Sequence, residues 1–333
     1  MILAPVNTWA VLKNNNHSDW RPTADLETLK QRARLLQQTR SFFYARDVLE
    51  VETPILTSTG STEVHLDQFD VNSETDNSNY YLITSPEFAM KRLLAAGSGD
   101  IFSLGKVFRA GEKGSRHQPE FTMLEWYRLG FDLEKLMQEV EQLLVVLFDD
   151  KLVQPSVTMT YAQAFEKIIS LNPLTATIDE LMFAVKQHSD MDVPSLDDRQ
   201  SYLDLIMSHF VEPTFSPDRL TFVTHYPAEQ ASLARLNKND PRVAERFEVF
   251  AGGLELANGF YELADVAEQR NRMLYDNKQR VEMGLTEIEL DQDFLSALEA
   301  GLPDCSGVAI GFDRLVMLAT GKQNINDVIS FAI

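Results

Sequence analysis

The sequence has a single cysteine, Cys305, and few basic residues for its length. One cysteine excludes an internal disulfide, and it cannot supply a zinc site made of several thiolates. The 30 Lys and Arg residues stand against 50 Asp and Glu, so the 333-residue chain has a formal net charge of −20. Proteins that bind nucleic acids broadly are usually basic, so this charge disfavours such a role.

Long apolar runs are also absent. No run approaches the roughly 20 residues that a helix needs to cross a bilayer, and the first residues lack the charged start and apolar centre of a secretion signal. We therefore expect a cytoplasmic protein with no membrane partner. An apolar fraction of 44% is enough to build a core, and the length allows one large domain or two ordinary ones.

The stretch from Leu104 to Arg128 differs from the acidic remainder. Between Ser85 and Gly130, seven Lys and Arg stand against five acidic residues, which indicates a small anionic ligand. Apolar and polar residues alternate at both ends of the stretch, and a polar connection with two glycines separates them. This pattern predicts an antiparallel hairpin with a long, basic tip.

Several residues of this predicted hairpin suit a nucleotide. Arg109 lies where the first strand ends, Arg116 and His117 lie in the loop, and Phe121 and Glu125 lie on the returning strand. Guanidinium groups match phosphate oxygens, and an exposed ring can stack on a base. The spacing alone is equally compatible with a surface hairpin whose charges are solvated.

Hydrophobic periodicity predicts the other elements. Residues 1–22 are expected to form an irregular leader, residues 57–79 a polar loop or irregular hairpin, and residues of about 151–217 a helical insertion. Helices are predicted at Asp25 to about Arg46, Phe88–Ala96, Leu133–Phe148, Asp265–Met283 and Asp291–Glu299. Strands are predicted at Val48–Pro54, Tyr80–Thr84, Leu220–Tyr226 and Ser306–Ile310.

Two carboxylates, Glu255 and Glu262, lie among apolar residues in a strongly alternating stretch. Seven residues apart, they would fall on opposite faces of a regular strand, unless a bulge at a glycine such as Gly259 brings them together. Buried carboxylates need a cation, so the pair predicts Mg²⁺ or a substrate ammonium. The alternative is a pair of solvent-facing acids.

Three ordered motifs resemble those of class II aminoacyl-tRNA synthetases. They are the helix and strand ending at Pro54, FR…RHQPEF…E from Phe108 to Glu125, and GFDR from Gly311 to Arg314. The stretches TSPE, HQPEFTMLEWY and GGLELANGFYEL are most similar to the lysine-specific branch. The resemblance implies an α+β fold with a central antiparallel sheet flanked by helices, a class II catalytic domain over residues 23–333.

Lysyl-tRNA synthetases carry an N-terminal anticodon-binding barrel, and the first motif here starts too early for one. The chain therefore resembles the truncated elongation factor P–(R)-β-lysine ligase family, whose members share ERFEVF…ELANGF…EL and PDCSGVA. The resemblance implies ATP-dependent activation of (R)-β-lysine or lysine as an aminoacyl-adenylate, with Mg²⁺, and transfer to a lysine of elongation factor P. It also implies a homodimer and no tRNA substrate.

The resemblance implies roles for individual residues. Arg109 and Arg314 would be catalytic. The ATP-binding residues would be Arg109, Ala110, Gly111, His117, Gln118, Phe121, Glu255, Leu256, Gly311 and Arg314, with adenine between Phe121 and Arg314. The substrate-binding residues would be Ser85, Pro86, Glu87, Glu125, Tyr127, Asn258, Phe260, Glu262 and Ala309. Glu255 and Glu262 are the predicted metal ligands.

The second motif departs from the family pattern. The family usually has FRNE, whereas this chain has FRAGE, so Ala110 and Gly111 replace an Asn and a Glu. Gln118 also replaces the usual Asn. Glu112, one position later, could substitute for the missing carboxylate. Two alternatives to the ligase are therefore a synthetase-like binding or regulatory protein with reduced activity, and a minimal lysyl-tRNA synthetase.

Overall fold

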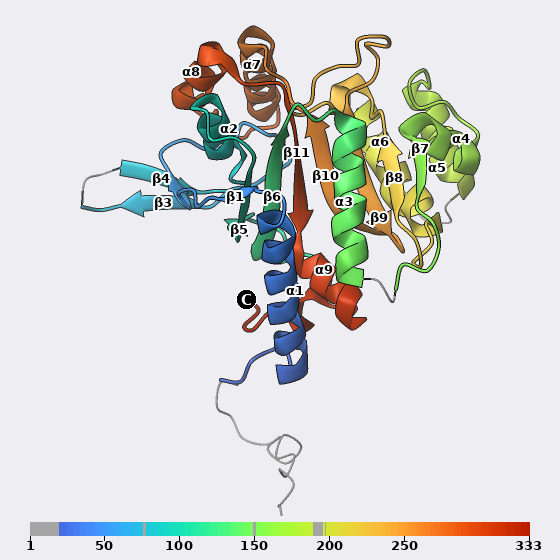
Figure 1. Ribbon diagram of the computed structural model, residues 1–333. Coiled ribbons are helices and arrows are strands. Elements are labelled where there is room, and N and C mark those ends of the chain that lie inside the picture. Colours follow the sequence, from blue (N-terminus) through green and yellow to red (C-terminus); the bar gives the residue numbers. More distant parts are fainter. Residues whose placement is uncertain (1–19, 76–77, 149–150, 189–195, 197) are drawn as a thin grey trace, which may run out of the picture.

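The computed structural model describes residues 20–75, 78–148, 151–188, 196 and 198–333, so most of the predicted leader lies outside the described residues. Its centre is an eight-stranded sheet (Figure 1). In spatial order the strands are β1 (Leu49–Glu50), β5 (Ile101–Phe108), β6 (Glu120–Leu129), β11 (Cys305–Gly311), β10 (Leu254–Tyr261), β9 (Arg246–Ala251), β8 (Thr221–Thr224) and β7 (Val157–Thr160).

The sheet is antiparallel from β5 to β8, and only the outer pairs, β1 with β5 and β7 with β8, are parallel. The predicted central antiparallel sheet is therefore confirmed. The predicted basic hairpin is β5 followed by β6, paired from Ile101↔Tyr127 to Phe108↔Glu120.

A second, three-stranded sheet is formed by β2 (Leu56–Thr57), β4 (Ser78–Leu82) and β3 (Asp70–Ser73), in that order. Because β3 and β4 are antiparallel, the irregular-hairpin alternative for residues 57–79 is confirmed. The strand predicted at Val48–Pro54 is shorter than expected, since only Leu49 and Glu50 pair with the sheet.

One face of the large sheet is covered by α1 (Leu26–Tyr44), α3 (Leu133–Phe148) and α9 (Phe312–Thr320) (Figure 1). Helix α1 begins after Asp25, whose carboxylate accepts a hydrogen bond from the Thr28 amide at 2.7 Å. Phe43 stacks on Phe102 of β5 with ring centroids 4.6 Å apart. This apolar layer fixes the sheet beneath the site.

Three further helices gather at one end of the sheet: α2 (Glu87–Ala95), α7 (Val266–Glu282) and α8 (Gln292–Gly301). Their shared core contains Met90, Met273 and Phe294 together with Tyr127 of β6. Phe88 stacks on Phe294 at 4.3 Å. Helix α2 is thereby held close to the strands that carry the predicted substrate residues.

The predicted insertion contains α4 (Tyr161–Ile169), α5 (Ile178–His188), α6 (Arg199–Ile206), the π turn η2 (Met207–Val211) and the 3-10 turn η3 (Glu212–Thr214). Its core includes Val223, Tyr226 and Phe250 from the sheet side. The sequence analysis missed β7, which precedes α4 and forms an edge of the large sheet. Short 3-10 turns also occur at η4 (Ala228–Gln230) and η5 (Ile325–Asp327).

Strand alternation separates the two faces of the sheet. Leu124 and Trp126 of β6 point into the core beneath α1 and α3, so Glu125 and Tyr127 point to the other face. Val308 and Ile310 of β11 likewise face the helices. In the described part of the chain, no helix is long and apolar enough to cross a membrane.

Candidate active site

Strand β11 brings only small residues to the face away from α1 and α3. They are Gly307, Ala309 and Gly311, which alternate with the buried Val308 and Ile310. Strand β6 lies on one side of β11 and β10 on the other. This small-residue row leaves space above the middle of the sheet between the larger side chains of its neighbours.

The register orders the predicted residues along this row. Ala309 pairs with Glu125 of β6 and with Asn258 of β10. One step along, Gly307 pairs with Tyr127 and Phe260, while Gly311 pairs with Met123 at the other end. The register therefore places residues from all three strands in successive rows on one face.

A glycine is required at Gly307. A Cβ atom there would lie 2.3 Å from the Tyr127 ring and 2.6 Å from Glu262 Oε1, closer than real contacts allow. Tyr127 and Glu262 thus lean over β11 from opposite sides. The absence of a side chain at Gly307 lets them approach each other.

The predicted bulge exists, but at a different residue. The pairing of β10 with β9 shifts between Glu255 and Ala257, whereas Gly259 pairs regularly with Phe247 and Val308. The prediction of a bulge at Gly259 was therefore wrong. Gly259 is small because a Cβ there would lie 2.4 Å from the Phe247 ring. The shift moves Glu255 to the face that also carries Asn258 and Glu262.

Glu255 and Glu262 nevertheless lie too far apart to bind the same metal ion. At about 3.3 Å per residue, seven residues of strand separate them by roughly 20 Å. The prediction that the two form one metal site is corrected accordingly, and each belongs to a different end of the small-residue row. Leu256 between them is buried in the core under the helices, so its side chain does not line the site.

At the Glu255 end, Arg314 is fixed by three contacts. Its Nη1 donates to the Glu255 carbonyl oxygen at 2.9 Å and to Glu255 Oε2 at 3.1 Å, and its Nη2 lies 2.7 Å from His117 Nε2. Burial and then the Arg314 charge lower the pKa of His117. A neutral His117 can accept the Arg314 N–H, so the two predicted ATP-binding residues support each other.

Arg109 lies at the exit of β5, as predicted. Its guanidinium is 5.2 Å from the centre of the Phe121 ring, and its Nη1 is 3.6 Å from Glu112 Oε1. Its Nε is buried without a hydrogen-bond partner among the described residues. Glu112 therefore lies close to Arg109, and Arg109 retains a free donor.

The residues that depart from the family pattern have clear local environments. Gly111 has a φ of +75° in the turn after β5, a conformation that favours glycine, and the Ala110 amide donates to the Asp67 carbonyl at 2.8 Å. Gln118 is buried, and its amide group bonds to Asn326 Oδ1 and to the Ile333 amide. In this structure Gln118 anchors the C-terminal segment.

At the other end, Ser85 and Tyr127 hold Glu125. The Ser85 hydroxyl donates to Glu125 Oε2 at 2.8 Å, and the Tyr127 hydroxyl donates to Oε1 at 2.6 Å. Ser85 Oγ also accepts the Glu87 amide, just after Pro86 at the start of α2. Burial and then repulsion by Glu87 raise the pKa of Glu125 to about 8.

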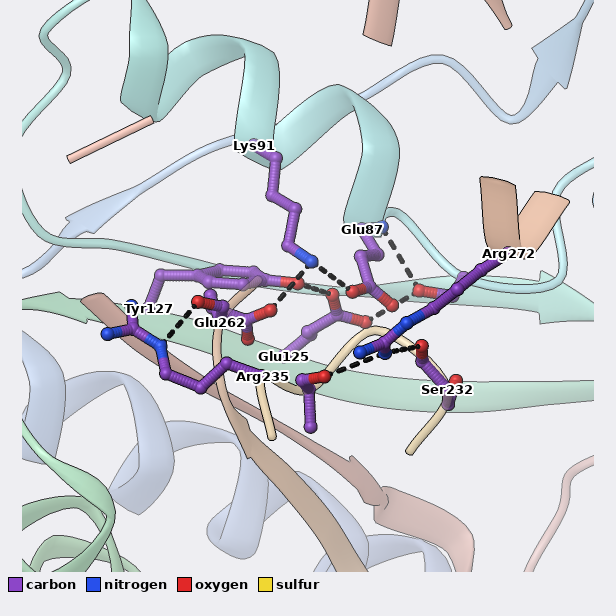
Figure 2. A network of polar contacts seen from close by, with 10 residues as sticks. Glu87, Lys91, Glu125, Tyr127, Ser232, Arg235, Glu262 and Arg272 are labelled. Carbon is purple, nitrogen blue, oxygen red and sulfur yellow. Dashed lines mark hydrogen bonds and ion pairs between the residues drawn. The ribbon is translucent and has the colours of Figure 1, made fainter. Parts of the chain in front are cut away.

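The sequence analysis missed Lys91, which lies between two predicted substrate residues (Figure 2). Its Nζ is 2.6 Å from Glu87 Oε1 and 2.6 Å from Glu262 Oε2, and its side chain is fully buried. We call Glu87, Glu125, Glu262 and Lys91 the acidic cluster. The sequence signal that could have identified Lys91 is its position four residues after Glu87 on the same helix.

A second group of missed residues lies on β9. Arg246 donates from Nη2 to Glu248 Oε1 at 2.5 Å and from Nε to the predicted Asn258 at 3.2 Å. Glu248 precedes Glu255 by the same seven residues that separate Glu255 from Glu262. Burial and then repulsion by Glu248 and Glu255 raise the pKa of Glu212 to about 7, so acidic groups meet here as well.

Comparisons with known proteins agree with the resemblance that the three motifs indicated. Residues 10–333 match the family model for class II tRNA synthetases (D, K and N). An elongation factor P–(R)-β-lysine ligase of Vibrio cholerae is 49% identical over 321 residues, 95% of this chain and 98% of that protein. Ligases of the same name from Avibacterium paragallinarum and Haemophilus influenzae are each 47% identical, with 94% and 96% of this chain covered and 98% of each relative.

The chain belongs to the elongation factor P–(R)-β-lysine ligase family. The recognition made from the motifs and the class II fold expected from it are both confirmed. The chain is thus a ligase-family protein with a synthetase-type domain. The fold places Arg109 and Arg314 at the opposite end of the small-residue row from the acidic cluster.

Proposed function

We propose that this chain activates (R)-β-lysine, or lysine, with ATP and transfers the acyl group to a lysine side chain of elongation factor P. The observation that carries the proposal is the polarity of the site. Arg109 and Arg314 lie at one end of the small-residue row, and three carboxylates lie at the other. A substrate with a carboxylate at one end, an ammonium group at the far end and a second ammonium group between them matches this arrangement.

In the first step, the substrate carboxylate attacks the α-phosphate of ATP. A new C–O–P linkage forms and the bond to pyrophosphate breaks, giving an aminoacyl-adenylate. Arg109 would contact the reacting phosphate, and Arg314 with Phe121 would flank the adenine. Because the attacking carboxylate is already ionised, the contribution of the protein is positioning and charge stabilisation.

In the second step, a lysine amine of elongation factor P attacks the acyl carbon of the adenylate. An amide bond forms, AMP leaves, and the amine loses a proton. The similarity to elongation factor P–(R)-β-lysine ligases supports this acceptor over a tRNA. They also favour an active ligase over a binding protein with reduced activity.

A magnesium ion bound with ATP would be held by Glu255, with Glu248 beside it. The described residues contain no group of three metal-binding side chains, but magnesium bound to a nucleotide needs only one or two carboxylates besides the phosphates. The two carboxylates are close enough to repel each other without a cation, since burial and the Glu255 charge raise the pKa of Glu248. The ion would neutralise phosphate charge.

The test is pyrophosphate exchange into ATP with a panel of lysine isomers, with and without elongation factor P. We expect exchange with (R)-β-lysine or lysine, and acylation of elongation factor P when it is present. Arg109→Ala should reduce the rate of exchange by at least 100-fold. Arg270→Ala should leave this rate unchanged, because Arg270 is an exposed residue of α7. No exchange with any isomer, in protein that still binds ATP, would contradict catalysis.

A further inference from the structure

Lys91 is an unusual residue to find in the interior of this fold. It lies on α2 between Met90 and Leu94, which pack into the apolar core with Phe294. Its side chain is 0% exposed, and a buried ammonium loses its hydration. A methionine of similar length would fill the same space without that loss. Packing of α2 therefore does not explain the presence of a lysine.

The contacts of Lys91 connect two carboxylates from different elements. Glu87 lies on α2, four residues before Lys91, whereas Glu262 follows β10. Burial alone would lower the pKa of Lys91, but Glu262 and then Glu87 raise it above its usual value. Lys91 is therefore a permanent cation that joins α2 to the end of β10.

Lys91 does not satisfy the whole carboxylate of Glu262. It is 1% exposed, and its two oxygens lack well-directed hydrogen bonds from any described residue. Oε2 approaches Lys91, while Oε1 points across Gly307 toward the Tyr127 ring. A buried carboxylate oxygen without a donor is an open place for a ligand ammonium.

The charge of the acidic cluster fits a ligand with two ammonium groups. Three carboxylates and one lysine carry a charge of −2 with every group ionised, which is the state that two bound ammonium groups would favour. The neighbouring guanidinium groups have acids of their own outside the cluster: Arg235 pairs with Asp304 at 2.9 Å, and Arg272 pairs with Glu268. Figure 2 shows both guanidiniums beside the cluster. Arg235 reaches Glu262 only through the backbone carbonyl oxygen, at 3.0 Å.

We propose that Lys91 is a positioning residue that holds Glu87 and Glu262 at a fixed separation and sets the charge of the acidic cluster to match a diammonium substrate. This inference rests on the proposed function. Without Lys91 the three carboxylates would repel one another more strongly, and Glu262 would stay protonated to higher pH. A protonated Glu262 no longer attracts the second ammonium group of the substrate.

Several titratable or charged groups face Glu262 and influence its pKa. They are Glu87 and Lys91 from α2, Glu125 and Tyr127 from β6, Arg235 from the loop before β9, and Cys305 of β11. Burial raises the pKa of Glu262 to about 7 even with Lys91 present. Loss of the Lys91 cation can only raise this pKa further, because a nearby positive charge favours the ionised carboxylate.

The experiment compares Lys91→Met with Arg92→Met. Arg92 is the next residue on α2, but it is about half exposed and pairs with Asp293 outside the cluster. Binding of lysine isomers and of ATP is measured separately by calorimetry from pH 6 to pH 9. We expect Lys91→Met to weaken binding of lysine isomers at least tenfold at pH 7, with ATP binding unchanged and Arg92→Met like wild type.

The pH dependence separates positioning from a merely structural role. In Lys91→Met, the loss of lysine affinity on the acid side should move to higher pH, since Glu262 then ionises only at higher pH. The double variant Lys91→Met with Glu125→Gln removes one of the repelling carboxylates. The pH at which it loses lysine affinity on the acid side should therefore move back toward that of wild type. Glu125 is held by Ser85 and Tyr127, so a packing defect at Lys91 would not respond to the change at Glu125.

Three outcomes would overturn the inference. The first is that Lys91→Met binds lysine isomers with the same affinity as Arg92→Met. The second is that Lys91→Met binds them more tightly than wild type, which would make Lys91 a competitor of the substrate. The third is that both Lys91 variants unfold while Arg92→Met folds. If wild type binds no lysine isomer and exchanges no pyrophosphate, the proposed function fails. If wild type does both and Lys91→Met matches it, only the role of Lys91 fails.

Discussion

At the scale of single residues, the site depends on side chains that are missing as much as on those present. Gly307 allows Tyr127 and Glu262 to meet above β11. Ala309, in the next row, adds one methyl group between Glu125 and Asn258. The distribution of charge around this row is simple: cations lie at one end and carboxylates at the other.

Gly307→Ala should damage both stability and substrate binding. Its Cβ would fall within 2.6 Å of two buried groups, and overpacking of this kind costs about 1–3 kcal/mol. Urea unfolding and the affinity for lysine isomers measure the two effects. Gly105→Ala on β5 is the control, because a Cβ there meets no atom within 4 Å. Equal behaviour of the two variants would show that the crowding at Gly307 is relieved.

Glu125 should make stability depend on pH. Burial and then Glu87 raise its pKa to about 8 in the folded protein, above the value of about 4.3 in an unfolded chain. Between these values the folded state holds the extra proton, so this contribution to stability is full at low pH and is lost as pH rises toward 8. We therefore expect the free energy of unfolding of Glu125→Gln, taken relative to that of wild type, to be higher at pH 8 than at pH 5.5.

Urea unfolding at pH 5.5 and pH 8 tests this expectation. Glu120→Gln is the matched control, since Glu120 lies on the same strand and its side chain is 39% exposed beside Lys106. The difference between Glu125→Gln and wild type should change with pH, and that of Glu120→Gln should not. A constant difference for Glu125→Gln would mean that Glu125 stays ionised throughout this range.

At the scale of elements, one buried carboxylate joins three of them. Asp313 at the start of α9 is 1% exposed. Its Oδ2 accepts the Thr122 amide of β6 at 2.6 Å, and its Oδ1 accepts Arg32 Nη1 of α1 at 2.5 Å. Because Arg314 is the next residue, this junction also fixes the helix end that carries a predicted catalytic arginine.

Arg32→Met should loosen the junction. Removing one partner of a buried ion pair costs about 3–5 kcal/mol, and the partial exposure of Arg32, 14%, places the loss toward the lower value. Urea unfolding measures it. Arg34→Met on the exposed side of α1 is the control, with an expected change within about 0.5 kcal/mol. A similar loss in both variants would assign the effect to α1 propensity and not to Asp313.

At the scale of the whole molecule, one edge of the large sheet is short and apolar. Strand β1 has two residues, and Leu49, Ile55 and Leu56 around it are each at least 44% exposed. Tyr44 at the end of α1 is 56% exposed close by. Exposed apolar groups at a sheet edge favour association. The homodimer expected from the first motif therefore remains our prediction for this edge.

Sedimentation velocity tests the dimer. Wild type should sediment as a dimer, and Leu49→Asp combined with Leu56→Asp should shift it to a monomer by placing two charges on the apolar edge. Leu274→Asp is the control, because Leu274 is 48% exposed on α7, away from this edge. A wild-type monomer at micromolar concentration, or a double variant that still dimerises, would contradict the assignment.

Local pattern was enough to predict much of this protein. Helix α3 has the predicted bounds, and α1, α7 and the β5–β6 hairpin differ from prediction by a few residues. These elements follow from periodicity and capping, which act over a few residues along the chain. The three motifs also gave the family, since their residue types and order are properties of the sequence itself.

The sequence by itself determined which residues are present at each end of the site, but tertiary structure decided which of them meet. Lys91 resembles an ordinary helix-surface lysine until α8 and β10 enclose it with Glu262. The position of the bulge beside Glu255 and the pairing of β7 with β8 were likewise decided by contacts between distant segments. Strand register and burial of charge depend on partners far away in the chain, and no local pattern encodes them.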